Sequence, residues 1–131
     1  MATAKSVLEA ITIAISNQLG ENAEVAIEFT GRKMELPISK IMVATGIRNA
    51  AVSYQEGLEG VSQIKRNLTV EALICAPKSS KGVTLADTVD GILSAVLGSG
   101  ELTLVKFYTG KASYSTSLSA ILQSVYITVE F

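Results

Sequence analysis

Four segments of the sequence alternate apolar and polar residues, the pattern of a β-strand with one face in a hydrophobic core. In three of them glutamate or threonine recurs on the polar side, which is typical of a sheet covered on a single face. The fourth, LTLVKFY, is apolar on both sides, so we expect it to be a more central strand. The four segments are AEVAIEF (residues 23–29), LTVEALICA (68–76), LTLVKFY (102–108) and VYITVEF (125–131).

The segment VYITVEF places Val125, Ile127, Val129 and Phe131 on one side of its strand. An uncovered apolar row of this kind would be a template for aggregation. We therefore expect this strand to be paired and covered, either inside one fold or between several copies of it.

Two other segments have the 3.6-residue periodicity of amphipathic helices. Ser6-Val7-Leu8-Glu9 and Thr84-Leu85-Ala86-Asp87 have capping-box spacing and predict where the helices begin. Gly20 is expected to stop the first helix in a left-handed conformation, and Gly98 and Gly100 to end the second. Neither helix would be stable alone, so both must pack on the sheet. Their apolar positions are Val7, Leu8, Ile11, Ala14, Ile15 and Leu19 in the first, and Leu85, Val89, Ile92, Leu93, Val96 and Leu97 in the second.

The middle of the chain predicts a long hairpin. KIMVATGI (40–47) and AAVSY (50–54) are expected to be short strands, and QEGLEG (55–60) a turn. The returning strand, residues 61–76, could extend about 50 Å, more than the sheet of a small domain, so part of the hairpin should project. The predicted fold is α+β: a two-layer domain with a mostly antiparallel sheet, two amphipathic helices packed on one face and a long projecting β-hairpin. It spans residues 1–131 as a single domain.

The sequence offers little catalytic chemistry. It contains no histidine and a single cysteine, which excludes Ser–His–Asp and Cys–His nucleophiles, Cys/His zinc sites and an internal disulfide. Cys75 lies in an apolar run and is expected to be a small buried side chain. Asp87 and Asp90 are explained by the helix dipole, which favours acids near the start of a helix, and not by a catalytic or metal site. Glu56 and Glu59 lack the spacing of an EF-hand calcium loop and are expected in a solvated turn. We predict no enzymatic activity and no cofactor.

The charge pattern points to no nucleic acid or membrane partner. The formal net charge is −1, and no segment approaches the ~18 apolar residues of a membrane span. Residues 30–82 hold eight basic and four acidic residues, but only one aromatic, Tyr54, so a solvated face or a subunit interface is favoured there. Charged residues form 18% of the chain, below the usual quarter, which fits large subunit contacts or a monomer with a Ser/Thr/Gly-rich surface.

The order of these elements resembles the tail-terminator (tail-completion) proteins of tailed bacteriophages and related phage-tail-like particles. An opening helix and a strand precede a hairpin whose second strand reads RNLTVEALICAP; a polar loop, the helix TLADTVDGILSAVLG and a strand pair ending in VYITVEF follow. The resemblance covers essentially the whole chain and depends on architecture and length. It implies a non-enzymatic virion protein, assembled in the bacterial host cytoplasm, that forms a ring, commonly a hexamer, on the end of the tail tube.

The resemblance also implies partners: further copies of the chain, the tail-tube protein, and a neck, head-completion or sheath protein. DNA would at most pass through the ring lumen. Two alternatives stay open, a tail-tube or connector subunit of the same particle and a small monomeric module that encloses an apolar ligand. On the tail-terminator interpretation the candidate assembly contacts are Arg48, Tyr54, Glu56, Glu59, Lys65 and Arg66.

Overall fold

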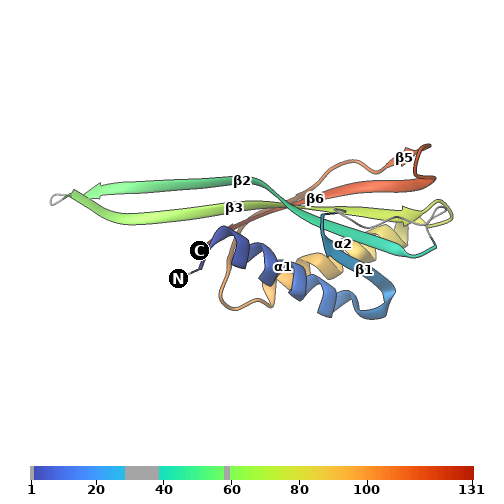
Figure 1. Ribbon diagram of the computed structural model, residues 1–131, viewed down its shortest axis with the longest axis horizontal. Helices are drawn as coiled ribbons and strands as arrows, with labels where there is room; N and C mark the ends of the chain where they lie inside the picture. Colours follow the sequence, from blue (N-terminus) through green and yellow to red (C-terminus); the bar gives the residue numbers. More distant parts are fainter. Residues whose placement is uncertain (1, 29–38, 58–59) are drawn as a thin grey trace.

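A six-stranded, mostly antiparallel sheet forms one layer of the molecule, and two helices cover one of its faces (Figure 1). The computed structural model describes residues 2–28, 39–57 and 60–131. The strand order is β1-β2-β3-β6-β4, with β1 parallel to β2 and the short β5 paired with β6. The elements are α1 (Ala4–Leu19), the 3-10 turn η1 (Gly20–Asn22), β1 (Ala23–Ile27), β2 (Ile41–Gly57), β3 (Gly60–Pro77), α2 (Gly82–Leu97), β4 (Thr103–Thr109), β5 (Ser113–Ser115) and β6 (Ala120–Glu130). The expected α+β architecture is therefore confirmed, including the projecting hairpin of β2 and β3.

The core lies between the sheet and the helices, where the apolar rows of β3 and β6 meet α1 and α2. β6 lies between β3 and β4, so the VYITVEF segment is paired on both sides and its apolar row is covered, as expected. At Gly91 of α2, an added Cβ would come within 2.7 Å of Leu19 Cδ2 of α1. Glycine therefore allows the two helices to approach closely here. The fully buried side chains include Ile11, Ile15, Leu68, Val70, Ile74, Ile92, Val125, Ile127 and Val129.

A pair of hydroxyls joins α1 to β2 inside this core. The side-chain oxygens of Thr12 and Thr45 are 2.7 Å apart, and Thr12 also donates to the Leu8 carbonyl oxygen at 2.7 Å. Both threonines are buried. Because a buried hydroxyl without a partner is costly, this pair favours one lateral position of α1 on the sheet.

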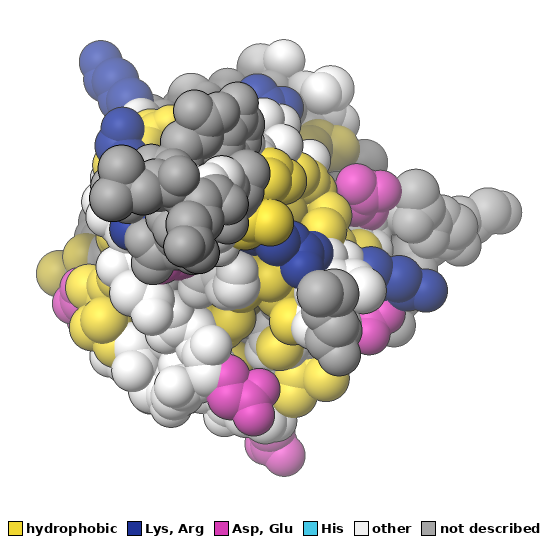
Figure 2. All heavy atoms as spheres, turned by 90° about the vertical axis from the view of Figure 1, so that its left-hand side faces the viewer, with side chains coloured by type: hydrophobic (Ala, Val, Ile, Leu, Met, Phe, Trp, Pro, Cys, Tyr) yellow, Lys and Arg dark blue, Asp and Glu magenta, His cyan; other side chains and the backbone are white. Residues whose placement is uncertain are grey.

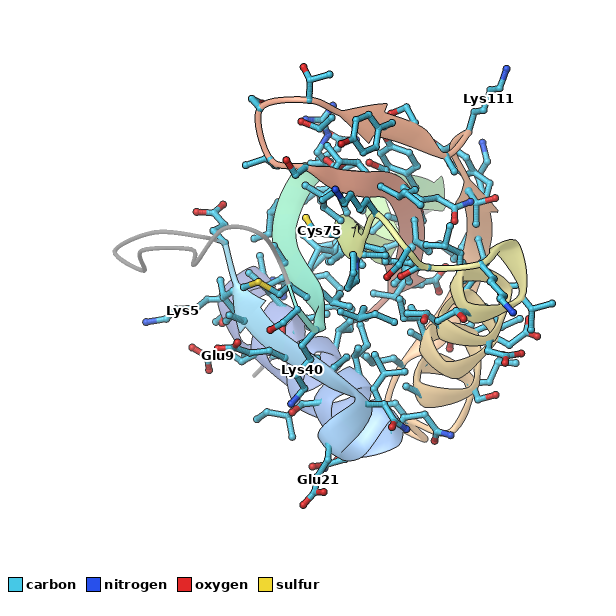
Figure 3. The ribbon with its side chains drawn as sticks, turned by 90° about the vertical axis from the view of Figure 1, so that its right-hand side faces the viewer. Lys5, Glu9, Glu21, Lys40, Cys75 and Lys111 are labelled. Carbon is cyan, nitrogen blue, oxygen red and sulfur yellow. The ribbon has the colours of Figure 1, made fainter. Side chains whose placement is uncertain are left out.

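The opposite face of the sheet is only partly covered. A small second cluster there contains buried Cys75 and Ala120, with Leu118 from the turn after β5 packed against it. Figure 3 shows Cys75 inside the molecule, whereas Lys5, Glu21 and Lys111 point outward. Burial raises the pKa of the Cys75 thiol from 9.0 to about 11, because the thiolate would lose its hydration. The prediction of a small buried side chain at this position is confirmed.

Neither predicted capping box is correct: the box of α1 lies three residues earlier, and α2 has none. Thr3 caps α1: its Oγ1 accepts the Ser6 backbone N–H at 3.1 Å, and Ser6 Oγ accepts the Thr3 N–H at 2.8 Å. α2 begins at Gly82 without a side-chain cap, which places Thr84 inside its first turn. The C-terminal ends of both helices were predicted more closely, because Gly20 follows α1 and Gly98 follows α2. Gly20 has the expected positive φ of 59° at the end of α1, although its ψ of −135° is not that of a left-handed helix.

Two strand predictions also need correction. Residues 41–57 form one strand, because a bulge between Ile47 and Asn49 absorbs the break in alternation that suggested two. β4 is an edge strand and not a central one. A register shift between Leu104 and Lys106 explains why its sequence lacks the simple alternation of a one-sided strand.

Candidate assembly surface

The outer part of the β2–β3 hairpin extends beyond every neighbouring strand. β1 pairs with β2 only as far as Thr45, and β6 pairs with β3 only from Asn67. We call residues 52–57 and 60–66 the arm; its two strands pair with each other from Val52 opposite Arg66 to Gly57 opposite Gly60. Figure 1 shows the arm at the left, well clear of the helices. Among the described residues, no strand pairs with its outer edges, and at its base the Arg66 carbonyl oxygen accepts a hydrogen bond from the Phe131 backbone N–H.

Arg66 fixes the base of the arm to both ends of the described chain. Its guanidinium lies over the Phe131 ring, with Cζ 4.4 Å from the ring centroid. Its Nη1 donates to the Ala2 carbonyl oxygen at 3.0 Å, and the Phe131 backbone N–H donates to the Arg66 carbonyl oxygen at 2.9 Å. The cation–π contact and these two hydrogen bonds hold the direction in which the arm leaves the sheet.

One face of the arm is the direct continuation of the core face of the sheet. Strand side chains alternate, so Ile64 and Arg66 lie on the same side of β3 as buried Leu68, and Val52 stands opposite Arg66. The helix layer does not reach this far, because Ala2, which precedes α1, already lies at the base of the arm beside Arg66. Val52 is 70% exposed and Ile64 64% exposed. Viewed along the arm, Figure 2 shows hydrophobic side chains beside Lys and Arg on the surface of the molecule.

The six predicted contact residues fall into separate places. Lys65 is exposed on the arm, and Arg66 is half-buried at its base. Tyr54 and Glu56 belong to the arm part of β2, where only their backbone is described, and Glu59 lies outside the described residues. The structure therefore brings four of the six onto the arm.

Arg48 lies away from the four arm residues, on the partly covered face of the sheet. Its Nε is 3.4 Å from Glu71 Oε1, and Glu71 Oε2 accepts a hydrogen bond from Ser124 Oγ at 2.6 Å. A groove of about 260 Å³ opens beside Arg48 and Glu71. Arg48 thus belongs to a polar cluster within the domain, and not to the arm.

The prediction missed Val52 and Ile64, the apolar side chains that the arm exposes. A signal for them was present, since an apolar residue on a part of a hairpin that projects from its domain cannot be covered by that domain. The prediction instead favoured the charged residues there. Leu97, expected in the core, is 64% exposed at the end of α2, so it too belongs to the surface.

Within the described parts of the chain, no three His, Cys, Asp or Glu side chains lie close enough together to hold a metal ion. Among the same residues, no helix combines the length and hydropathy needed to cross a membrane. A scan against protein-family models found no match, and a search among curated proteins found no similar sequence.

Proposed function

We propose that this chain is a structural subunit of a phage tail or phage-tail-like particle, and that it forms a ring which caps the tail tube and joins it to the head or neck. The proposal depends on the resemblance in element order together with one observation, the exposure of the Val52 and Ile64 side chains on the arm. It is an assembly function without catalysis or cofactor. Its partners would be further copies of the chain, the tail-tube protein and a neck, head-completion or sheath protein.

The arm supports assembly for a physical reason. Val52 and Ile64 lie beyond the reach of the chain's own helices, on strands whose outer edges are unpaired among the described residues. Apolar side chains and free strand edges together are features of surfaces that become covered by another protein. The anchor at Arg66 presents this surface in a defined direction, which favours specific assembly over nonspecific association.

Native mass tests the proposal. Light scattering on a sizing column, followed by negative-stain images of the same peak, should show closed rings; six copies of the 13.8-kDa chain would total about 83 kDa. Adding the protein to growing tail tubes should then stop their elongation.

Two other results would point to other functions. Open filaments would indicate a tail-tube or connector subunit, because a contact that does not close continues to polymerise. A protein that stays monomeric at every concentration and leaves tube growth unchanged would contradict the ring proposal. Extraction of an apolar compound from that monomer would then identify it as a ligand-binding module.

A further inference from the structure

The outer edge of β2 is unpaired over a long stretch whose centre carries no charge. β1 occupies this edge only as far as Thr45, whose carbonyl oxygen accepts the Glu28 backbone N–H at 2.8 Å. From residue 46 to residue 57, no strand in the described part of the chain pairs with it. We call this stretch the β2 edge. Its central seven residues, NAAVSYQ (49–55), include no charged residue, proline or glycine.

The other edges of the sheet carry features by which proteins prevent unwanted strand pairing. On the arm, the edge of β3 holds Lys65 and Arg66, and the Arg66 carbonyl oxygen is already bonded to the Phe131 N–H. β4 holds Lys106 and a register shift after Leu104. β1 and β5 are only five and three residues long. The β2 edge lacks such protection between residues 49 and 55, so it is the edge best suited to accept another strand.

The β2 edge is complementary to itself in an antiparallel register that sets Val52 of one copy opposite Val52 of another. Residues directly opposite in an antiparallel pair face the same side of the sheet. This register therefore brings together two valine side chains that are each 70% exposed in the single chain. On the same side of the sheet Ala50 lies opposite Tyr54, and on the other side Asn49 lies opposite Gln55. Apolar and aromatic residues are thus matched on one side, amide residues on the other, and no like charges are opposed.

The length of the β2 edge selects the same register. With Val52 at the centre, residues 47–57 of the two copies run alongside each other, and Thr45 falls beyond Gly57 of the other copy. Each β1 therefore ends just before it would meet the other arm. Moving the centre one residue toward the body would set Gly57 against Thr45, whose carbonyl oxygen is already bonded. Moving it one residue toward the tip would shorten the overlap to residues 49–57.

The helices leave room for this pairing. Arg66 lies opposite Val52 on the arm and is bonded to Ala2, just before α1. α1 therefore begins at the level of Val52 and runs toward its own body, away from the tip of the arm (Figure 1). The helix layers of two copies paired at Val52 would extend in opposite directions.

We propose that two copies of this chain pair through their β2 edges, antiparallel and about a two-fold axis at Val52, so that their sheets continue across the contact. Residues 49–55 of the two strands would exchange about six to eight backbone hydrogen bonds. A two-fold contact closes between two copies, whether these are free chains or members of two rings. The inference therefore goes beyond the proposed function, whose ring requires a separate head-to-tail contact.

Disulfide trapping tests the register directly. In Val52→Cys the two thiols would face each other across the axis, on Cα atoms about 4.5–5.5 Å apart, which is within the reach of a disulfide. Mild oxidation should link most of the chains into dimers. Native Cys75 is buried and should not contribute.

Ile64→Cys is the matched control for this trapping. Ile64 is similarly exposed, at 64%, and lies on the same face of the arm. In the proposed contact the β2 strands of both copies separate the two Ile64 residues. This variant should therefore give at least about fivefold less dimer than Val52→Cys. Equal linking of the two variants would overturn the contact.

Charge pairing at the axis gives a second measurement. Val52→Lys or Val52→Glu alone would set like charges opposite each other and should weaken self-association about fivefold, as sedimentation equilibrium would measure. An equal mixture of the two variants sets opposite charges together and should recover most of the association. A mixture of Ile64→Lys with Ile64→Glu is the control and should show no such recovery. A Val52 mixture that associates no better than its separate components would overturn the two-fold register.

The outcomes separate the inference from the proposed function. Tube capping by a protein whose Val52→Cys variant links no more than the control would overturn the contact and leave the function in place. Specific Val52 links in a protein that does not stop tube growth would support the contact and overturn the function. A native protein that stays monomeric at every concentration and leaves tube growth unchanged would overturn both.

Discussion

The strand β3 has two halves with similar alternation and opposite surroundings. From Leu68 to Ala76 its inward side chains are fully buried under α1 and α2, whereas Ile64, on the same side of the same strand, is 64% exposed. The alternation decides which side a residue faces, but burial depends on where the covering helices end. The body half therefore stabilises the domain, and the arm half is available to another molecule.

The same substitution in a strand paired with each half should give the largest difference. Val129→Asp in β6 places a carboxylate in the core beside Leu68, at a cost of several kcal/mol, and the protein should fail to fold. Val52→Asp in the arm, where the side chain is 70% exposed, should change the melting temperature little and weaken self-association. Circular dichroism melts and native mass measure the two effects. A Val129→Asp protein that melts normally would refute the assignment of the body half.

The buried threonine pair tests how strictly α1 is positioned on the sheet. Thr12→Val alone should cost about 1–3 kcal/mol of unfolding free energy, because it leaves the buried Thr45 hydroxyl without this partner. Thr12→Val with Thr45→Val should cost clearly less than the sum of the two single changes. Chemical denaturation of the three variants gives this coupling energy. Strict additivity would mean that the two hydroxyls do not interact.

The Cys75 thiol links the stability of the body to pH. The pKa of this thiol is raised from 9.0 to about 11 in the folded protein. As pH rises above 9 the thiol therefore ionises first in the unfolded chain, and the free energy of unfolding falls between pH 9 and pH 11. At pH 11 the loss should be about 2 kcal/mol. Unfolding free energies of the native protein and of Cys75→Ala between pH 8 and pH 11 should show a steeper decline for the native protein. Parallel curves would contradict the shifted pKa.

The smallest effect is expected at the boundary between the halves. Arg66→Ala removes the contact with Phe131 and the hydrogen bond to Ala2, and should lower stability by about 1 kcal/mol. Lys65→Ala, next to it but exposed, is the control and should stay within about 0.5 kcal/mol of the native protein. Equal effects from both variants would show that Arg66 does not anchor the arm.

Much of this fold follows from local patterns in the sequence. Helical periodicity and strand alternation act over a few residues, so they correctly predicted two helices, a covered VYITVEF strand and a projecting hairpin. The errors occur where an extra residue interrupts a pattern. Because of the bulge after Ile47, the continuous strand β2 was predicted as two strands. Because of the bulge after Leu104, the edge strand β4 was predicted to be central. The α1 cap was misplaced because two overlapping boxes, at Thr3 and Ser6, have similar chemistry.

The candidate surface could be predicted only in part. Lys65 and Arg66 were expected on the hairpin, and they are there. The exposure of Val52, Ile64 and Leu97 depends on where helices end in space, which no local pattern contains. The contact of Arg66 with Phe131 and Ala2 depends on chain ends that lie more than sixty residues from it in sequence.

The position of β6 between β3 and β4 also has a consequence during synthesis on the ribosome. Residues 120–130 (β6) emerge after all the strands with which they pair. The edge of β3 that faces β6 therefore stays unpaired until translation has passed β4 and β5. A nascent chain with an open apolar edge is prone to wrong pairing and aggregation. Slow translation between β3 and β6 would lengthen that interval, and the yield of folded protein should fall with it.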